Sequence, residues 1–308
     1  MAILVFVETQ DGKFKKAGLE AVSYAAQLNA GEVTALCIGD NEGAEAVAKI
    51  GAASLVSLSD MGHFDPQKVS SVICQVATEL GVDTVVVSNS YAGKAIAPQV
   101  AKQWDASLAT NVVSLPNAAG EITRGVYSGK AFAQVKLNGD RKVLAITPNS
   151  FDIVDNNQPG AVKDVSVNVP EGRVALKELK KVTGKVPLTE AEIVVSGGRG
   201  LKGPENWGLV ENLANELNAA TACSKPVSDM DWRPHSEHVG QTGITIKPNL
   251  YIAIGISGAI QHLAGVSSSK TIVVINKDPE APFFKAADYG IVGDAFDVIP
   301  KLTEALKN

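Results

Sequence analysis

The stretch Leu250–Gly265, which reads Leu-Tyr-Ile-Ala-Ile-Gly-Ile-Ser-Gly-Ala-Ile-Gln-His-Leu-Ala-Gly, decides the fold of the second half of the chain. Its first five residues are rich in β-branched and aromatic side chains and predict a buried strand. Small residues interrupt the run at Gly255–Gly258, and apolar residues recur at helical spacing from Ala259 onward. Free backbone N–H groups at such a turn attract an anion, which predicts a phosphate site beside Gln261 and His262. Glycines that serve only packing explain the same pattern equally well.

Length and composition limit the class of protein. The 308 residues are enough for two domains, and 45% of them are hydrophobic and 20% charged, as in proteins with packed cores. A net charge of −5 argues against nucleic acid and anionic membranes as partners. The three cysteines show no paired spacing, which favours a reducing compartment. With no signal peptide and no apolar run near the ~20 residues of a membrane span, we expect a cytoplasmic protein that is not membrane-embedded.

The N-terminal half alternates strand and helix patterns, among them strands at 54–58 and 84–88 and a helix opened by Asp65-Pro66, which predicts βαβ units and a mostly parallel sheet. No strand-to-helix turn in this half carries Gly-x-Gly-x-x-Gly, so no nucleotide is assigned to it. Beyond Val112, glycines and Asn138-Gly139-Asp140 punctuate three short β runs at 122–126, 131–137 and 142–147. These runs predict an antiparallel hairpin addition at the sheet edge. The stretch from Asn156 to about Glu190 has few periodic apolar residues and should hold the linker between domains.

The second domain carries a glycine-rich turn between a strand at 192–196 and a helix. Gly198, Gly200 and Gly203 satisfy Gly-x-Gly-x-x-Gly, and Arg199 inside the motif can grip a phosphate. An NAD site would place an acid about 20 residues further on, but that neighbourhood is Ala220–Cys223, and the first acid from there onward is Asp229. The motif therefore favours a nucleotide cofactor other than NAD. A glycine-rich turn with an incidental arginine is the structural alternative.

Polar residues stand at five predicted strand ends of this domain. They are Arg199, Ser224, Ser257, Asn276 and Asp294. Ligands of open parallel sheets bind outside the carboxyl ends of the strands, so these residues predict a single crevice. The expected fold class is α/β, with two domains of mostly parallel sheet: residues 1–188, and residues 189–308 as a doubly wound cofactor-binding sheet.

Several kinds of catalytic chemistry lack a sequence signature. The His235-Ser-Glu-His238 cluster and Cys223 form the one candidate metal set, but their context predicts a solvated loop. No nucleophile elbow, Gly-Lys-Ser/Thr phosphate loop or paired carboxylates occur. We therefore predict no catalytic residue and no metal ligand. A cofactor crevice without substrate-activating groups indicates redox chemistry carried by the cofactor itself.

Several segments of the second domain resemble the FAD domain of the α subunit of electron-transfer flavoproteins. These segments are Gly198-Arg199-Gly200, Cys223-Ser224, Val239–Gly243, Leu250–Gly265, Ile275–Pro279 and Tyr289–Val292 before Asp294. The resemblance implies a heterodimer whose β subunit contacts the N-terminal domain and carries AMP or a second, bifurcating FAD. It implies one FAD in the C-terminal domain of this chain. Electrons would pass from acyl-CoA or other flavin dehydrogenases, as in fatty-acid β-oxidation, to a membrane quinone oxidoreductase.

The resemblance also implies roles for individual residues. The pyrophosphate would be held by Arg199 with Gly200 and by Ser257, Gly258, Ala259 and Ile260. Ser224, Asn276, Asp294 and Ala295 would line the cofactor, and Val239, Gly240, Gln241 and Thr242 would lie at the flavin ring, with the Thr242 hydroxyl near N5. Gln261 and His262 would approach the ribityl chain and the pyrimidine end, where a cation stabilises reduced flavin.

One residue departs from the family pattern. Many members carry arginine after the serine at position 224, whereas this chain has Lys225, which keeps the charge but loses the planar stacking surface. This difference implies an altered flavin potential with FAD binding retained. Two other functions fit the residues without the resemblance: a non-catalytic adenine-nucleotide-binding regulator, and then an NAD-dependent dehydrogenase.

Overall fold

The computed structural model describes residues 2–127, 131–172, 174–178 and 187–307. The chain divides into two compact units, the first built mainly from residues 1–181 and the second mainly from residues 182–308. Both units are α/β with mostly parallel sheets, which confirms the predicted fold class. The predicted boundary at residues 188 and 189 and the role assigned to each domain stay predictions.

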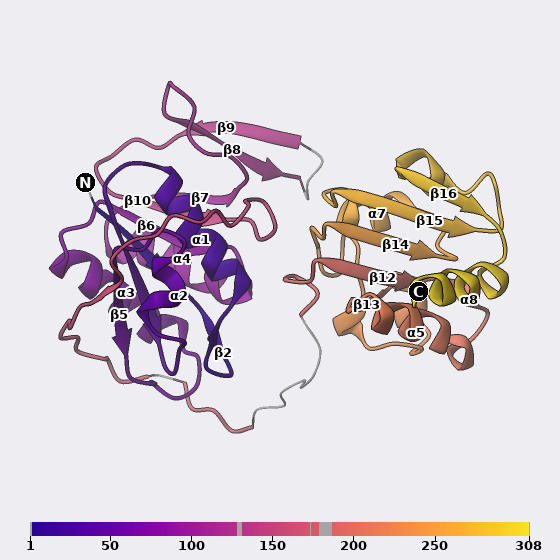
Figure 1. Cartoon of the computed structure of the whole chain (residues 1–308), viewed down its shortest axis with the longest axis horizontal. Helices are drawn as coiled ribbons and strands as arrows, with labels where there is room; N and C mark the ends of the chain where they lie inside the picture. Colours follow the sequence, from indigo (N-terminus) through magenta and orange to yellow (C-terminus); the bar gives the residue numbers. More distant parts are fainter. Residues whose placement is uncertain (1, 128–130, 173, 179–186, 308) are drawn as a thin grey trace. The chain divides into compact units, whose positions relative to one another are not determined.

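The first unit is built on a nine-stranded sheet in the order β11-β5-β4-β1-β6-β10-β7-β8-β9 (Figure 1). Its strands are β1 Ala2–Phe6, β4 Glu32–Ile38, β5 Ser54–Leu58, β6 Thr84–Ser88, β7 Ser107–Val112, β8 Glu121–Val126, β9 Ala131–Lys136, β10 Lys142–Ile146 and β11 Ala161–Val162. The short strands β2 Thr9–Gln10 and β3 Lys13–Phe14 form a separate antiparallel pair.

Helices cover both faces of this sheet because successive side chains of each central strand point to opposite sides. Along β1, Ile3 and Val5 join the core beneath α1 Lys16–Gln27 and α2 Ala44–Ala48, whereas Leu4 and Phe6 join the core beneath α3 Pro66–Glu79 and α4 Tyr91–Gln103. The predicted capping of α3 is confirmed: the Asp65 carboxylate accepts a hydrogen bond of 2.8 Å from the Gln67 backbone N–H, and Pro66 occupies the first turn.

One expectation for the first unit needs correction. The run at 142–147 is not part of an edge hairpin: β10 lies inside the sheet, parallel to both β6 and β7, while β8 and β9 occupy the edge. The start of the predicted linker is attached to the first unit, because β11 pairs in parallel with β5. The remainder of that stretch falls partly on residues 173 and 179–186, outside the described residues.

The second unit is a five-stranded, fully parallel sheet in the order β13-β12-β14-β15-β16. Its strands are β12 Ile193–Gly197, β13 Ala220–Cys223, β14 Leu250–Ile254, β15 Thr271–Asn276 and β16 Tyr289–Val292. The helices are α5 Gly208–Glu216, α6 Lys225–Asp229, α7 Ile260–Val266 and α8 Ala295–Ala305, with 3₁₀ turns η1 Arg199–Leu201, η2 Pro204–Asn206, η3 His235–Glu237 and η4 Pro282–Ala286. Numbered along the chain, the strand order is 2-1-3-4-5, that of a doubly wound fold.

The strand predicted within Leu250–Gly265 is β14, at the centre of this sheet, and the helix predicted from Ala259 is α7. Tyr251 and Ala253 of β14 point into the core on the α7 face, while Ile252 and Ile254 point toward α5 and α8. Within the described residues, no helix has the length and apolar character to cross a membrane.

Candidate functional site

A cavity of about 410 Å³ opens at the carboxyl ends of the strands of the second unit. The strand order reverses at β12 and β14, and the cavity lies at this switch point, where open α/β sheets bind ligands. Its volume falls within the range of about 300 to 1,000 Å³ typical of small-molecule sites. The wall is formed by Arg199, Gly200, Ser224, Lys225, Pro226, His238, Val239, Gly240, Gln241, Thr242, Gly255, Ile256, Ser257, Ala259, Gln261, His262, Asn276, Asp278 and Ala281.

Most of the residues singled out in the sequence lie in this wall. Four do not: Gly258, Ile260, Asp294 and Ala295. Ile260 is 67% exposed at the start of α7, and Gly258 packs against Phe283 instead. Asp294 caps α8 beyond the edge strand β16, where its carboxylate accepts a hydrogen bond from the Phe296 backbone N–H. Binding of cofactor by the predicted residues therefore stays a prediction, supported by position for most of them.

The glycine-rich turn after β12 and the turn after β14 touch through their backbones. The Gly200 N–H donates a 3.0 Å hydrogen bond to the Gly255 carbonyl, and a Cβ on Gly200 would lie 2.6 Å from the Gly255 Cα. Gly255 has a φ of +61°, a conformation that glycine adopts without strain. These glycines thus serve packing between two turns, and they also shape the floor of the cavity.

The glycine-rich turn lies between a strand and a helix, as predicted, but it does not lead directly into the helix. Two 3₁₀ turns, η1 and η2, follow β12, and α5 begins only at Gly208. Arg199 lies in η1 and is exposed at the cavity wall. No ion pair or hydrogen bond engages its guanidinium within the described part of the chain, so this charge is free to meet an anion.

The loop after α6 contributes the opposite wall through the segment His238–Thr242. The Val239 N–H donates to the Cys223 carbonyl over 3.1 Å, and the Gln241 N–H donates to the Gln261 carbonyl over 2.7 Å. The segment is thereby tied to the end of β13 on one side and to α7 on the other. Gln241 and Thr242 are presented at its exposed tip.

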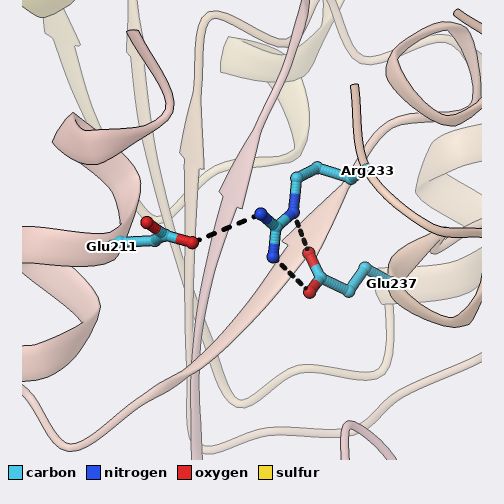
Figure 2. Close-up of polar contacts among 3 residues, drawn as sticks. All are labelled: Glu211, Arg233 and Glu237. Atoms are coloured by element: carbon cyan, nitrogen blue, oxygen red, sulfur yellow. Dashed lines mark hydrogen bonds and ion pairs between the residues drawn. The ribbon is translucent and has the colours of Figure 1, made fainter. Parts of the chain in front are cut away.

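Arg233 anchors the base of this loop (Figure 2). Its Nε lies 2.8 Å from Oε2 of Glu237 and its Nη2 lies 2.7 Å from Oε1 of the same carboxylate, a bidentate pair. A third contact of 3.3 Å joins Nη1 to Oε1 of Glu211 on α5. The guanidinium also lies 5.4 Å from the centre of the Trp207 ring. The loop that was expected to be solvated is therefore fixed to α5 and to Trp207 at its base.

His262 lies at the inner end of the cavity and is 6% exposed. Its Nε2 lies 2.8 Å from the hydroxyl of fully buried Tyr251, and its ring packs edge-on against Phe283 at 5.7 Å between centroids. Its buried Nδ1 has no well-aligned hydrogen-bond partner among the described residues, although the backbone of Val239 favours the protonated form slightly. Burial, reinforced by repulsion from His238, lowers the pKa of His262 to about 4, so the imidazole is neutral near pH 7.

Cationic side chains outnumber acids in the cavity wall. Lys225 stands at the start of α6, where its Nζ lies 2.8 and 2.7 Å from the two carboxylate oxygens of Asp229. This hydrogen-bonded pairing lowers the pKa of Asp229. Arg199 and Lys225 thus bring two positive charges to a wall in which Asp278 is the acid, and the cavity suits an anionic ligand.

Asn276 combines a place in the wall with a structural role. Its Nδ2 donates to the Ile256 carbonyl over 3.0 Å, and its Oδ1 accepts from the Asp278 N–H over 3.1 Å. The side chain therefore joins the turns after β14 and β15, which are two neighbouring sides of the cavity. Ser224 is buried at the start of α6, and its hydroxyl does not cap that helix.

Sequence reasoning missed six residues of the wall: Pro226, His238, Gly255, Ile256, Asp278 and Ala281. All except Ala281 are adjacent to a predicted residue or lie within a motif already quoted, so proximity along the chain was the available signal for those five. His238 is the largest miss, since the loop containing it was expected to be solvated and the ring is only 7% exposed. Within the described ranges, no three His, Cys, Asp or Glu side chains gather as metal ligands.

Comparison with known proteins gives matches along nearly the whole chain. The profile of the electron transfer flavoprotein domain matches residues 3–170, and that of the electron transfer flavoprotein FAD-binding domain matches residues 187–267. Asn276, Asp294 and Ala295 lie beyond the second match.

Full-length relatives agree with these domain matches. The chain is 37% identical to the electron transfer flavoprotein subunit alpha of Bacillus subtilis, over 99% of the chain and 97% of that relative. It is 38% identical to the corresponding subunit of Pseudomonas aeruginosa, over 99% and 100% of the two chains. It is 37% identical to the probable mitochondrial alpha subunit of Caenorhabditis elegans, over 98% and 93%. The chain belongs to the family of electron transfer flavoprotein alpha subunits.

Proposed function

We propose that this chain is the FAD-carrying subunit of a heterodimeric electron carrier. In this proposal, electrons pass from flavin dehydrogenases such as acyl-CoA dehydrogenases to a membrane quinone oxidoreductase. The observation that carries the proposal is the cavity of about 410 Å³ at the sheet reversal, formed largely within the part of the chain that matches the FAD-binding domain. The partner would be a β subunit that contacts the first unit and holds AMP or a second FAD, and the location would be cytoplasmic.

The donor groups of the cavity fit a dinucleotide flavin. Arg199 would supply positive charge for a pyrophosphate and Lys225 positive charge near the flavin ring, and the polar side chains of Ser224, Gln241 and Thr242 would supply hydrogen bonds for the ring and its substituents. The buried Nδ1 of His262, which has no aligned partner among the described residues, is a polar atom available to a ligand at the inner end. When bound, FAD would supply the redox chemistry, since these side chains form no nucleophile–base set.

The chain's own residues would bind and orient the cofactor. Arg199 would grip the phosphates, and the hydrogen bond between Gln241 N–H and the Gln261 carbonyl would hold the Gln241–Thr242 tip against α7. The neutral imidazole of His262, oriented by the Tyr251 hydroxyl, would donate or accept a hydrogen bond at the inner end without adding charge. Asp294 and Ala295 would act from outside the wall, through the α8 end that contacts η1: the carboxylate of Asp294 lies 3.8 Å from Nζ of Lys202.

The test is co-expression of the chain with its neighbouring β-subunit gene, followed by purification and absorption spectroscopy. We expect a yellow complex with flavin peaks in the blue, and the Arg199→Ala variant should lose FAD more readily than the wild type on dilution. We also expect the chain expressed alone to be poorly stable and to hold FAD weakly. A complex that binds adenine nucleotide without flavin would support the alternative, a non-catalytic regulator, and would overturn the proposal.

A further inference from the structure

His238 stands out among the cavity residues because the function proposed above leaves it without a role. It is buried, it lines the same cavity as His262, and it begins the segment that presents Gln241 and Thr242. Its backbone is fixed on both sides: the His238 carbonyl accepts a 2.8 Å hydrogen bond from the Ile244 N–H, and the residue bridges to Cys223 at the end of β13.

The His238 ring fills the space inside the turn that follows it. A Cβ on Gly243 would lie 2.8 Å from the ring Nδ1, and a Cβ on Gly240 would lie 3.4 Å from Nε2. The two glycines therefore leave room for the imidazole, and the imidazole supports the turn from beneath. A change in the position or charge of the imidazole would therefore act on the turn, which contains Gln241 and Thr242.

Charged and titratable groups face His238 from each element around it. Lys225 and Asp229 approach from α6, His235 from η3 and His262 from α7, while Cys223 of β13 is its bridge partner. Lys225 and His235 disfavour a positive charge on the ring and Asp229 favours one; with burial as the largest cause, the pKa of His238 lies below its usual value. A negative charge entering the cavity would instead favour a positive charge on the His238 ring.

We propose that His238 is a positioning residue of the flavin site: it supports the Gln241–Thr242 turn and takes up one proton from solvent when the bound cofactor is reduced. This inference rests on the proposed function. The two electrons come from a reductant, which is the donor flavoprotein in the cell and dithionite in the test, and the reductant is oxidised. The proton comes from water and ends on the imidazole, where its positive charge balances part of the negative charge that the electrons bring.

The test is a reductive titration of the FAD-loaded complex between about pH 5 and pH 8, comparing wild type, His238→Gln and His235→Gln. One extra proton per two electrons changes the equilibrium constant tenfold per pH unit, so the midpoint potential of the wild type should fall more steeply than that of His238→Gln by up to about 30 mV per pH unit. His235 is the matched control: it is an exposed histidine of the same loop, its Nδ1 lies 2.7 Å from the Ser228 hydroxyl, and it does not line the cavity. His235→Gln should keep the wild-type slope.

Equal slopes in wild type and FAD-loaded His238→Gln would overturn the inference. If His238→Gln cannot hold FAD, the ring nitrogen resonances of the wild-type complex decide instead. This chain has four histidines, so when it alone carries the nitrogen label in the complex, the His238 signal can be assigned with variants at the other three positions. A shift toward imidazolium on reduction near neutral pH supports the inference, and an unchanged signal overturns it. A wild-type complex without any FAD would refute the proposed function, and this inference with it.

Discussion

Acid should destabilise the second unit through His262. The folded chain holds this imidazole neutral, because burial lowers its pKa from 6.5 to about 4. The unfolded chain exposes it to water, where its pKa returns to its ordinary value. Between these two pKa values the unfolded state binds a proton that the folded state lacks, so stability falls as the pH drops below the unfolded value and the loss is complete near the folded one.

The size of the effect follows from the pH interval. The interval from the pKa of His262 in the unfolded chain down to pH 5 is about 1.5 pH units. At about 1.36 kcal/mol per pH unit, the free energy of unfolding falls by about 2 kcal/mol over this interval. The Tyr251 hydroxyl, at 2.8 Å from Nε2, fixes the ring in place, so it cannot turn outward to relieve the cost without breaking that bond. A loss of this size is a large part of the net stability of a domain.

The assay is urea unfolding of wild type, His262→Gln and His235→Gln at pH 7 and pH 5. For each protein, the change in the free energy of unfolding between pH 7 and pH 5 is determined. Subtracting this change for a variant from that for the wild type cancels the contributions of the titratable groups that all three proteins share. The wild type should lose about 2 kcal/mol more than His262→Gln over this interval, and His235→Gln should behave as the wild type. An equal pH effect in wild type and His262→Gln would refute the assignment of a buried, neutral imidazole.

Three further changes have defined outcomes. Arg233→Lys replaces the bidentate pair with Glu237 by a single point contact and should cost about 1–2 kcal/mol in urea unfolding, with faster loss of FAD. Gly255→Ala forces a side chain onto a φ of +61° and should cost about 2 kcal/mol or more, whereas Gly208→Ala, with no atom within 4 Å of the new Cβ, should be close to neutral. Lys225→Ala should lower the flavin reduction potential while FAD is retained, as measured by redox titration.

Each of these outcomes can fail in a recognisable way. An Arg233→Lys variant as stable as the wild type would show that the loop does not depend on the bidentate pair between Arg233 and Glu237. Equal stabilities of the two glycine variants would contradict the close approach of the two turns. An unchanged or raised potential in Lys225→Ala would count against the assignment of Lys225 as the cation near the reduced flavin ring.

Local patterns predicted most elements of the fold because each depends on nearby residues. The runs at 54–58 and 84–88 are strands with the predicted bounds, and Asp65-Pro66 opens α3 as expected. The pairing of strands, by contrast, could not be predicted from nearby residues. The run at 142–147 looks like the last arm of a hairpin, but β10 pairs with β6, a strand more than fifty residues earlier in the chain. No local pattern encodes that pairing, since it follows from burial of both faces of β10.

The candidate site was predictable to the extent that it lies at strand ends. Arg199, Ser224, Ser257 and Asn276 follow β12 to β15, so a parallel sheet brings them to one edge. Asp294 follows β16, which is separated by β15 from the switch point at β12 and β14, and it lies outside the wall. The burial of His238 was not predictable, because it depends on the Arg233 ion pairs and on two glycines that leave room for a ring.

The contact between Gly200 and Gly255 also constrains redesign of this protein. Any library that diversifies the pocket to accept a different cofactor should keep both positions fixed, because every side chain at either one meets backbone rather than a movable neighbour. Variation is structurally easiest at wall positions whose side chains are exposed, such as Lys225, Gln241 and Asp278. A saturation screen should therefore tolerate many residues at these three positions and almost none at the two glycines.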